Sequence, residues 1–252
     1  MDPHANSPTS IRLYRYLPDE AAIKTIERRS FRVSRLAELN DPFEWRFGFE
    51  GIPPETEEFI QVQMDGFLED ASKEMGIICF SGEIKDPILW SHYANVHRGI
   101  AFEVIGNIVS EANGSITFEV NGRRYENLFK VDYDKPRIVL HAQELSQLTE
   151  KRIEGFYKQK SKSWGYEREY RWVIGLLSSA CEPSGGRFLW TIPPDFVTRV
   201  IIGFRSSVSE QYARRALELN GFQNIEITKA RLSQTTYEIK LSDPTGSSPS
   251  CE

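Results

Sequence analysis

The chain has few cysteines and no long apolar run, and both features restrict the classes of protein to which it can belong. Its three cysteines, Cys79, Cys181 and Cys251, are scattered and form no C-x-x-C pair. An odd, dispersed set predicts neither a disulfide framework nor a cysteine-based zinc site, and it is typical of a reduced cytoplasmic protein. No apolar stretch approaches the length of a membrane span, and the N-terminus is polar rather than signal-like. We therefore expect a cytoplasmic protein without membrane association.

The chain also lacks a net positive charge and several catalytic signatures. Lys and Arg number 31 against 36 Asp and Glu, a net charge of −5, so net charge does not indicate a nucleic-acid partner. The chain has no P-loop and no G-x-G-x-x-G, which excludes those two phosphate cradles. Ser81 and Cys79 do not lie in a G-x-S-x-G nucleophile elbow. His92 and His97 lack the glutamate and spacing of a zinc protease, so we predict no metal site.

The pattern of apolar residues predicts an α+β fold. Hydrophobic residues make up 40% of the chain, which is enough for a core. Periodicity and turn signals predict helices at 18–29, 54–75, 87–93, 137–160 and 209–219, with short strands between them. Two hairpins are predicted, one around Asn121-Gly122 and one between 170–177 and 188–192. We expect a single α+β domain over 11–241, on a mixed, largely antiparallel sheet flanked by helices. A disordered N-terminus (1–10) and a disordered Ser/Pro-rich tail (242–252) are expected on either side.

The most informative segment is Trp164–Ile174, where charged and aromatic residues run directly into an apolar, β-branched stretch. The second half predicts a buried strand. Period-two geometry then places Glu167 and Glu169 on the same side of the chain, at the start of that strand. Two interpretations follow: an ion-pair network with Arg168 and Arg171, or an acid/base site that uses the carboxylates.

Three further clusters have the same mixture of polar and aromatic residues. They are Leu13-Tyr14-Arg15-Tyr16, the turn Leu39–Trp45, and the span from Cys79-Phe80-Ser81-Gly82 to Leu89-Trp90-Ser91-His92-Tyr93-Ala94 and His97-Arg98-Gly99. With the Glu-x-Glu-Tyr-Arg strand, their order and spacing over roughly 11–241 resemble an uncharacterised bacterial family, a domain of unknown function. That resemblance implies no activity.

The same residues show a second resemblance. An Arg on the first strand, a Ser at the end of a middle strand and a Glu-x-Glu entering a later strand resemble the arrangement in ADP-ribosyltransferases. The resemblance implies that NAD is the substrate and that Arg15 anchors its pyrophosphate, with Tyr14 beside it. It implies that Ser81 orders the site, that Glu169 holds the ribose, and that Glu167 assists an unknown macromolecular acceptor. Trp90, His92 or Tyr93 would stack on nicotinamide.

Two features leave a non-enzymatic alternative open. The Ser-Thr-Ser strand of those transferases is absent around Ser81, and Arg15 and Glu169 could simply pair inside the core. The alternative is a non-catalytic binding module in stress response or phage defence. Convergence of Arg15, Ser81 and Glu169 on one cleft distinguishes the two. Asp41, which lies between Asn40 and Pro42, and the nearby Glu44 are expected to be mainly architectural.

Overall fold

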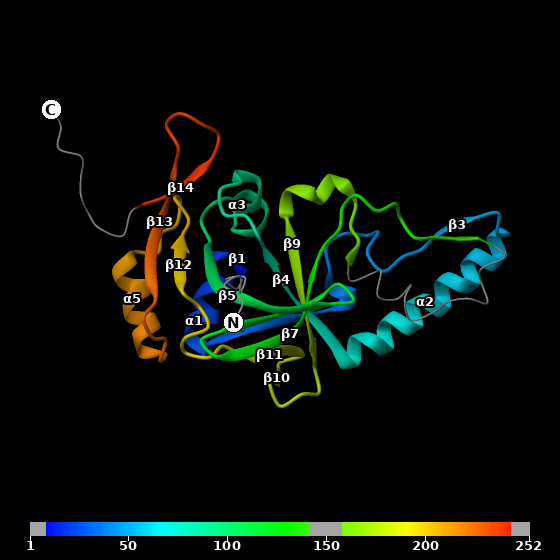
Figure 1. Cartoon of the computed structure of the whole chain (residues 1–252), viewed down its shortest axis with the longest axis horizontal. Coiled ribbons are helices and arrows are strands. Elements are labelled where there is room, and N and C mark those ends of the chain that lie inside the picture. Colours follow the sequence, from blue (N-terminus) through cyan, green and yellow to red (C-terminus); the bar gives the residue numbers. More distant parts are fainter. Residues whose placement is uncertain (1–8, 142–157, 243–252) are drawn as a thin grey trace, which may run out of the picture.

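The centre of the molecule is a closed ring of strands. The structure is a computed structural model that describes residues 9–141 and 158–242. In ring order the strands are β1 (Ser10–Leu17), β4 (Met75–Ser81), β9 (Glu169–Gly175), β7 (Arg123–Lys130), β6 (Ser115–Val120) and β5 (Ile100–Ala112). Every neighbouring pair is antiparallel, and β5 pairs with β1 to close the ring (Figure 1).

Further strands extend the ring on two sides. From β4 the sheet continues through β2 (Ser30–Arg35), β11 (Arg187–Thr191) and β10 (Cys181–Ser184). From β5 it continues through β12 (Arg199–Ile202), β13 (Glu226–Leu232) and β14 (Ile239–Leu241), with β12 and β13 parallel. The prediction of a mixed, largely antiparallel sheet is confirmed, but the sheet contains a closed six-stranded barrel instead of being simply open.

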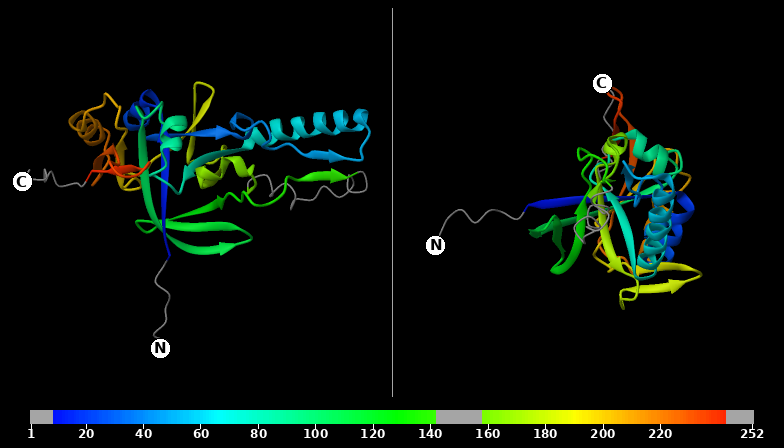
Figure 2. Two further views of the ribbon diagram at one scale, coloured as in Figure 1. Left: turned by 90° about the horizontal axis from the view of Figure 1, so that it is seen from above. Right: turned by 90° about the vertical axis from the view of Figure 1, so that its right-hand side faces the viewer.

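Helices lie around the barrel and along one extension. They are α1 (Asp19–Arg28), α2 (Pro54–Glu74), α3 (Pro87–Tyr93) and α5 (Glu210–Leu219), with 3-10 turns η1 (Leu36–Glu38) and η3 (Lys162–Glu167). Helix α1 packs against α5 on one side of the barrel. Helix α2 projects away from the barrel beside the small parallel pair β3 (Gly48–Glu50) and β8 (Val139–His141) (Figure 2).

The core is divided by the alternation of side chains along β1. Ile11 and Leu13 join the main apolar cluster with Phe102 and Phe118. Tyr14 and Tyr16 instead join a second cluster around Trp90 and Leu89. Successive side chains of a strand point to opposite faces, so β1 separates these two clusters and places its polar middle near their boundary.

Two sequence predictions of secondary structure are wrong. The helix expected over 137–160 begins instead with strand β8, which pairs with β3, and most of the remaining span lies outside the described residues. The second hairpin forms between β10 and β11, whereas β9 pairs with β4 and β7 inside the barrel. The tails expected to be disordered also lie almost wholly outside the described residues. Within the described part of the chain, no helix is long and apolar enough to cross a membrane.

Candidate functional site

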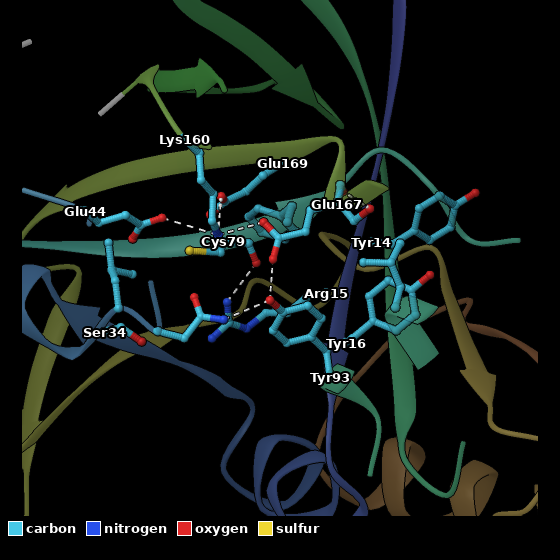
Figure 3. A pocket seen from close by; sticks show the side chains of 15 residues that line it. Tyr14, Arg15, Tyr16, Ser34, Glu44, Cys79, Tyr93, Lys160, Glu167 and Glu169 are labelled. Carbon is cyan, nitrogen blue, oxygen red and sulfur yellow. Dashed lines mark hydrogen bonds and ion pairs between the residues drawn. The ribbon is translucent and has the colours of Figure 1, made fainter. Parts of the chain in front are cut away.

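Strand register brings the polar clusters together at one end of β4. Tyr14 of β1 is opposite Ser81 of β4, and Ser81 is in turn opposite Glu169 of β9. A cavity of about 190 Å³ opens here, between these strand ends, α3 and the turn after η1 (Figure 3). Residues from all four sequence clusters line it: Tyr14, Arg15, Asn40, Glu44, Ser81, Tyr93, Glu167 and Glu169. The polar clusters, far apart in sequence, therefore meet at one cavity.

Three glutamates surround a buried lysine beside the cavity. The Nζ of Lys160 lies 2.7 Å from Glu167 Oε2, 3.4 Å from Glu169 Oε2 and 3.3 Å from Glu44 Oε1. All four side chains are at most 8% exposed. In Figure 3 the carboxylates of Glu167 and Glu169, from one segment, and of Glu44, from a distant turn, converge on the ammonium group.

A second buried cation completes the cluster. Arg171, the third residue of β9, donates from Nε and Nη2 to the two carboxylate oxygens of Glu169, at 3.1 and 2.9 Å. Its Nη2 also bonds Glu44 Oε1. Three carboxylates therefore face two cations, so the fully ionised cluster has an excess of one negative charge. In a low-dielectric interior, this imbalance favours protonation of one carboxylate.

The surroundings separate the pKa values of the two glutamates. Burial acts to raise the pKa of Glu169, but Arg171 and Lys160 outweigh it and the pKa falls below its ordinary value. For Glu167, burial dominates over Lys160, and the charge of Glu169 adds to it, so the pKa rises. Two neighbouring carboxyls with divergent pKa values are a recurrent feature of acid/base sites. The geometry thus favours an ionised Glu169 beside a Glu167 able to exchange a proton.

Tyr93, at the end of α3, connects this pair to the far wall of the cavity. Its hydroxyl donates to Glu167 Oε1 and accepts a 3.0 Å hydrogen bond from Asn40 Nδ2. Burial, followed by Glu167, raises the pKa of Tyr93, so the phenol stays neutral and remains a donor. Asp86 caps α3 by accepting from Ile88 N, which fixes the start of the helix that presents Tyr93.

Ser81 orders the segment on which the glutamates lie. Its hydroxyl donates to the backbone carbonyl of Glu167 at 2.6 Å and accepts from the backbone N–H of Glu83 at 3.0 Å. Next to it, the N–H of Gly82 donates to the carbonyl of Arg168, whose φ of 44° turns the chain between Glu167 and Glu169. Ser81 therefore bonds backbone groups on both sides of it, and it holds the Glu167 carbonyl against the end of β4.

Arg15 reaches the cavity wall but is occupied by backbone groups. Its Nη1 donates to the carbonyl of Cys79 at 3.0 Å, and its Nη2 donates to the carbonyl of Arg32 at 2.9 Å. Burial lowers the pKa of Arg15 to about 10. Both terminal nitrogens of the guanidinium are thus occupied in joining β4 to β2, and they are not available to a pyrophosphate. The anchoring role expected for Arg15 is not met.

The three residues expected to stack on nicotinamide lie in different surroundings, and only one of them lines the cavity. Trp90 is fully buried, donates from Nε1 to the carbonyl of Ile84 and packs edge-on against Tyr16, so its assignment to a ligand is wrong. His92 does not line the cavity; its Nδ1 lies 3.0 Å from the hydroxyl of Tyr166. Tyr93 does line the cavity.

Two residues of the charged cluster were not assigned to the site from sequence. Glu44 was expected to be architectural, and Lys160 was taken only as the end of a helix. The Asn40–Trp45 turn, with an acid among aromatic residues, was a signal for Glu44, whereas Lys160 had none. Among the described residues, no group of three or more His, Cys, Asp and Glu side chains is arranged to hold a metal ion.

Comparison with known proteins finds a family model that matches the part of the chain carrying much of this site. Residues 89–172 match the family model described as a protein of unknown function, DUF2971. The matched third of the chain runs from α3 through β9 and includes Tyr93, Lys160, Glu167 and Glu169. The expected resemblance to an uncharacterised family is thus supported, and the family description names no activity. Neither the curated proteins nor the solved structures contain a match to this chain.

Proposed function

We propose that the protein cleaves the nicotinamide–ribose bond of NAD and transfers ADP-ribose, in the manner of an ADP-ribosyltransferase. The observation that supports this most is the buried pair Glu167 and Glu169, which have divergent pKa values and line one cavity. Breaking a glycosidic bond develops positive charge on the sugar, and paired carboxylates are the usual means of stabilising it and of moving the accompanying proton.

The two glutamates have separate roles in this mechanism. The bond from ribose C1′ to the pyridinium nitrogen breaks, and nicotinamide leaves as a neutral molecule with the bonding electrons. Glu169, which stays ionised, stabilises the oxocarbenium cation. A lone pair of the acceptor, or of water, then forms a bond to C1′, and the acceptor's proton passes to Glu167, whose raised pKa suits a general base. Tyr93 orients that carboxylate.

The dimensions of the cavity limit what enters it. At about 190 Å³ it is smaller than the roughly 300–1,000 Å³ typical of sites for drug-sized ligands. The nicotinamide end of NAD would therefore enter, and the adenylate end would lie outside. Arg15 acts here as a positioning residue that fixes β4 beneath the glutamates, instead of as a pyrophosphate ligand.

Release of nicotinamide tests the proposal. Purified protein is incubated with NAD, with and without cell extract as a source of acceptors, and nicotinamide is measured by chromatography. We expect release that exceeds that of a heat-denatured sample and increases with extract. An absence of nicotinamide release in both conditions would refute the proposal.

The alternative is a non-catalytic binding module, and one observation favours it. Each carboxylate of the cluster pairs with Lys160 or Arg171, which an ion-pair network with a purely structural role would also show. In that case the purified protein would release no nicotinamide from NAD above the heat-denatured control, even if NAD raised its melting temperature. Release of nicotinamide would instead favour the enzyme.

A further inference from the structure

A second, larger cavity lies against the charged cluster and has no role in the mechanism above. We call it the Phe43 groove. It has a volume of about 550 Å³ and lies between the turn 41–46, the segment 133–138 and the segment 159–162. It shares Glu44 and Lys160 with the smaller cavity, so these two residues form part of the wall of both.

Two buried carboxylate oxygens in residues that line the groove lack partners. Asp41 is 4% exposed and the Glu44 side chain 3% exposed. Asp41 Oδ2 and Glu44 Oε2 accept no hydrogen bond from any group in the described residues. A buried acceptor without a donor costs free energy. Because both residues line the groove, a rotation of their side chains would offer these oxygens to a ligand that presents N–H or O–H donors.

Exposed cations lie at the edge of the same groove. Lys135 and Lys162 both line it, with side chains 55% and 86% exposed. Their ammonium groups lie 3.4 Å from Asp132 and 3.6 Å from Asp134. Pairs between such exposed side chains are weak. A doubly charged phosphate, with more acceptor oxygens than a single carboxylate, can displace these aspartates.

An exposed aromatic ring completes the set. Phe43 is 60% exposed although it lines the groove, and the guanidinium of Arg137 lies 5.0 Å from the centre of its ring. Arg137 is itself held by a hydrogen bond from Nη2 to the carbonyl of Phe47. An exposed aromatic ring is the kind of surface on which nucleobases stack.

We propose that the Phe43 groove binds a nucleotide. The base stacks on Phe43 and donates its amino group to Asp41 or Glu44, and the phosphate binds Lys135 and Lys162. A nucleotide supplies a planar ring, N–H donors and an anion together, which no single amino-acid side chain does. The same chemistry occurs in a free nucleotide, in the adenylate half of NAD and in one unit of a single-stranded nucleic acid. The proposal does not depend on NAD cleavage.

Binding of adenosine monophosphate to the full chain tests the proposal by calorimetry. We expect adenosine and ribose 5-phosphate each to bind at least tenfold more weakly, since each lacks one of the recognised groups. Lys135→Glu combined with Lys162→Glu should weaken binding of the monophosphate at least tenfold, and Phe43→Ala should weaken it severalfold. Lys240→Glu and Tyr237→Ala, exposed positions near β14 and remote from the groove (Figure 1), should leave binding unchanged.

Two further arms identify the source of the nucleotide. Competition of the monophosphate with NAD would assign the groove to the adenylate half of NAD, and tighter binding of a short single-stranded oligonucleotide would assign it to nucleic acid. Failure of all these ligands to bind at millimolar concentration, or equal binding by the doubly reversed variant, would overturn the proposal. Nicotinamide release that persists in either event would leave the proposed function standing.

Discussion

Asp41 and Glu44 belong to one turn, yet their surroundings give them different roles. Asp41 Oδ1 accepts a 2.9 Å hydrogen bond from the N–H of Phe43, the local bond that its position before Pro42 predicts. Glu44 instead bridges Lys160 and Arg171 inside the charged cluster. The sequence identified the local bond because both partners lie in the turn. It did not identify the bridge, because both cations are more than a hundred residues away.

The turn bond of Asp41 can be measured by removing it. Asp41→Ala should lower the free energy of unfolding by about 1 kcal/mol, as the loss of a comparable capping bond does. Urea unfolding of the variant and the wild type provides the comparison. An Asp41→Ala protein of unchanged stability that has lost all nicotinamide release would show that Asp41 is functional rather than architectural.

Much of the site at residue scale was nevertheless predictable from sequence. Glu167, Glu169, Ser81 and Arg15 converge as expected. Ser81 and Glu169 lie at strand ends that their local patterns mark, Glu167 lies just before one, and Arg15 lies within β1. The pairing of Arg171 with Glu169 was also among the interpretations of the sequence. Trp90 was misassigned because an aromatic residue beside polar ones has the same local pattern in a core as in a binding site.

At the scale of elements, the loop that follows α3 has an unusual backbone conformation. It holds the end of α3, and with it Tyr93, in place. Asn95, Val96 and His97 all have positive φ, of 44°, 52° and 66°. The N–H of Gly99 returns to the carbonyl of Ala94, and a Cβ at Gly99 would lie 2.1 Å from the carbonyl oxygen of Leu17. The loop thus packs directly on β1, and only glycine fits at its end.

Val96 is the costly member of this loop, because a β-branched residue disfavours positive φ. Its side chain is 44% exposed, so little burial is lost when it is replaced. Val96→Asn should raise the stability by about 1 kcal/mol, since asparagine tolerates this conformation. Val109→Asn, at a similarly exposed position in β5, is the matched control and should be neutral or destabilising. If Val96→Asn is no more stable than the wild type, the positive φ of Val96 does not lower the stability of the protein, and the prediction is wrong.

Elements with strong local signals were predicted correctly, and elements fixed by distant partners were not. Helices α1, α2, α3 and α5 follow from periodicity and from helix-start residues within their own segments, and α3 and α5 also have side-chain caps. Strand β8 has three residues and exists through its pairing with β3, so a local pattern could not reveal it. Closure of the barrel depends on β1 pairing with both β4 and β5, a fact of topology that alternation along β1 does not encode.

For the whole molecule, the raised pKa of Glu167 makes stability depend on pH in a definite direction. The folded state holds the proton of this carboxyl more tightly than the unfolded chain does. Its contribution to the free energy of unfolding is therefore complete below the pKa in the unfolded chain, about 4.3, and is lost as pH rises through the higher pKa in the folded state. Glu167→Gln removes this titration. We therefore expect the wild type to lose stability relative to the variant as pH increases from about 4 to about 8. Chemical unfolding of both proteins across that range measures the difference, and a difference independent of pH would contradict the assignment.

The central claim is that the paired glutamates at the end of the barrel perform glycosidic chemistry. Its most direct test is the rate of nicotinamide release by Glu169→Gln at equal concentration of folded protein, verified by a thermal melt. The substitution leaves two carboxylates facing two cations, so the charges balance once Glu44 and Glu167 are both ionised, and the fold should persist. We predict a rate lower by about 10²–10³ with NAD still bound, while Glu182→Gln, at an exposed position in β10, keeps the wild-type rate. If the Glu169→Gln protein does not fold, the same measurement on Glu167→Gln, which Arg171 does not bond, replaces it. A folded variant that releases nicotinamide at the wild-type rate would contradict the account.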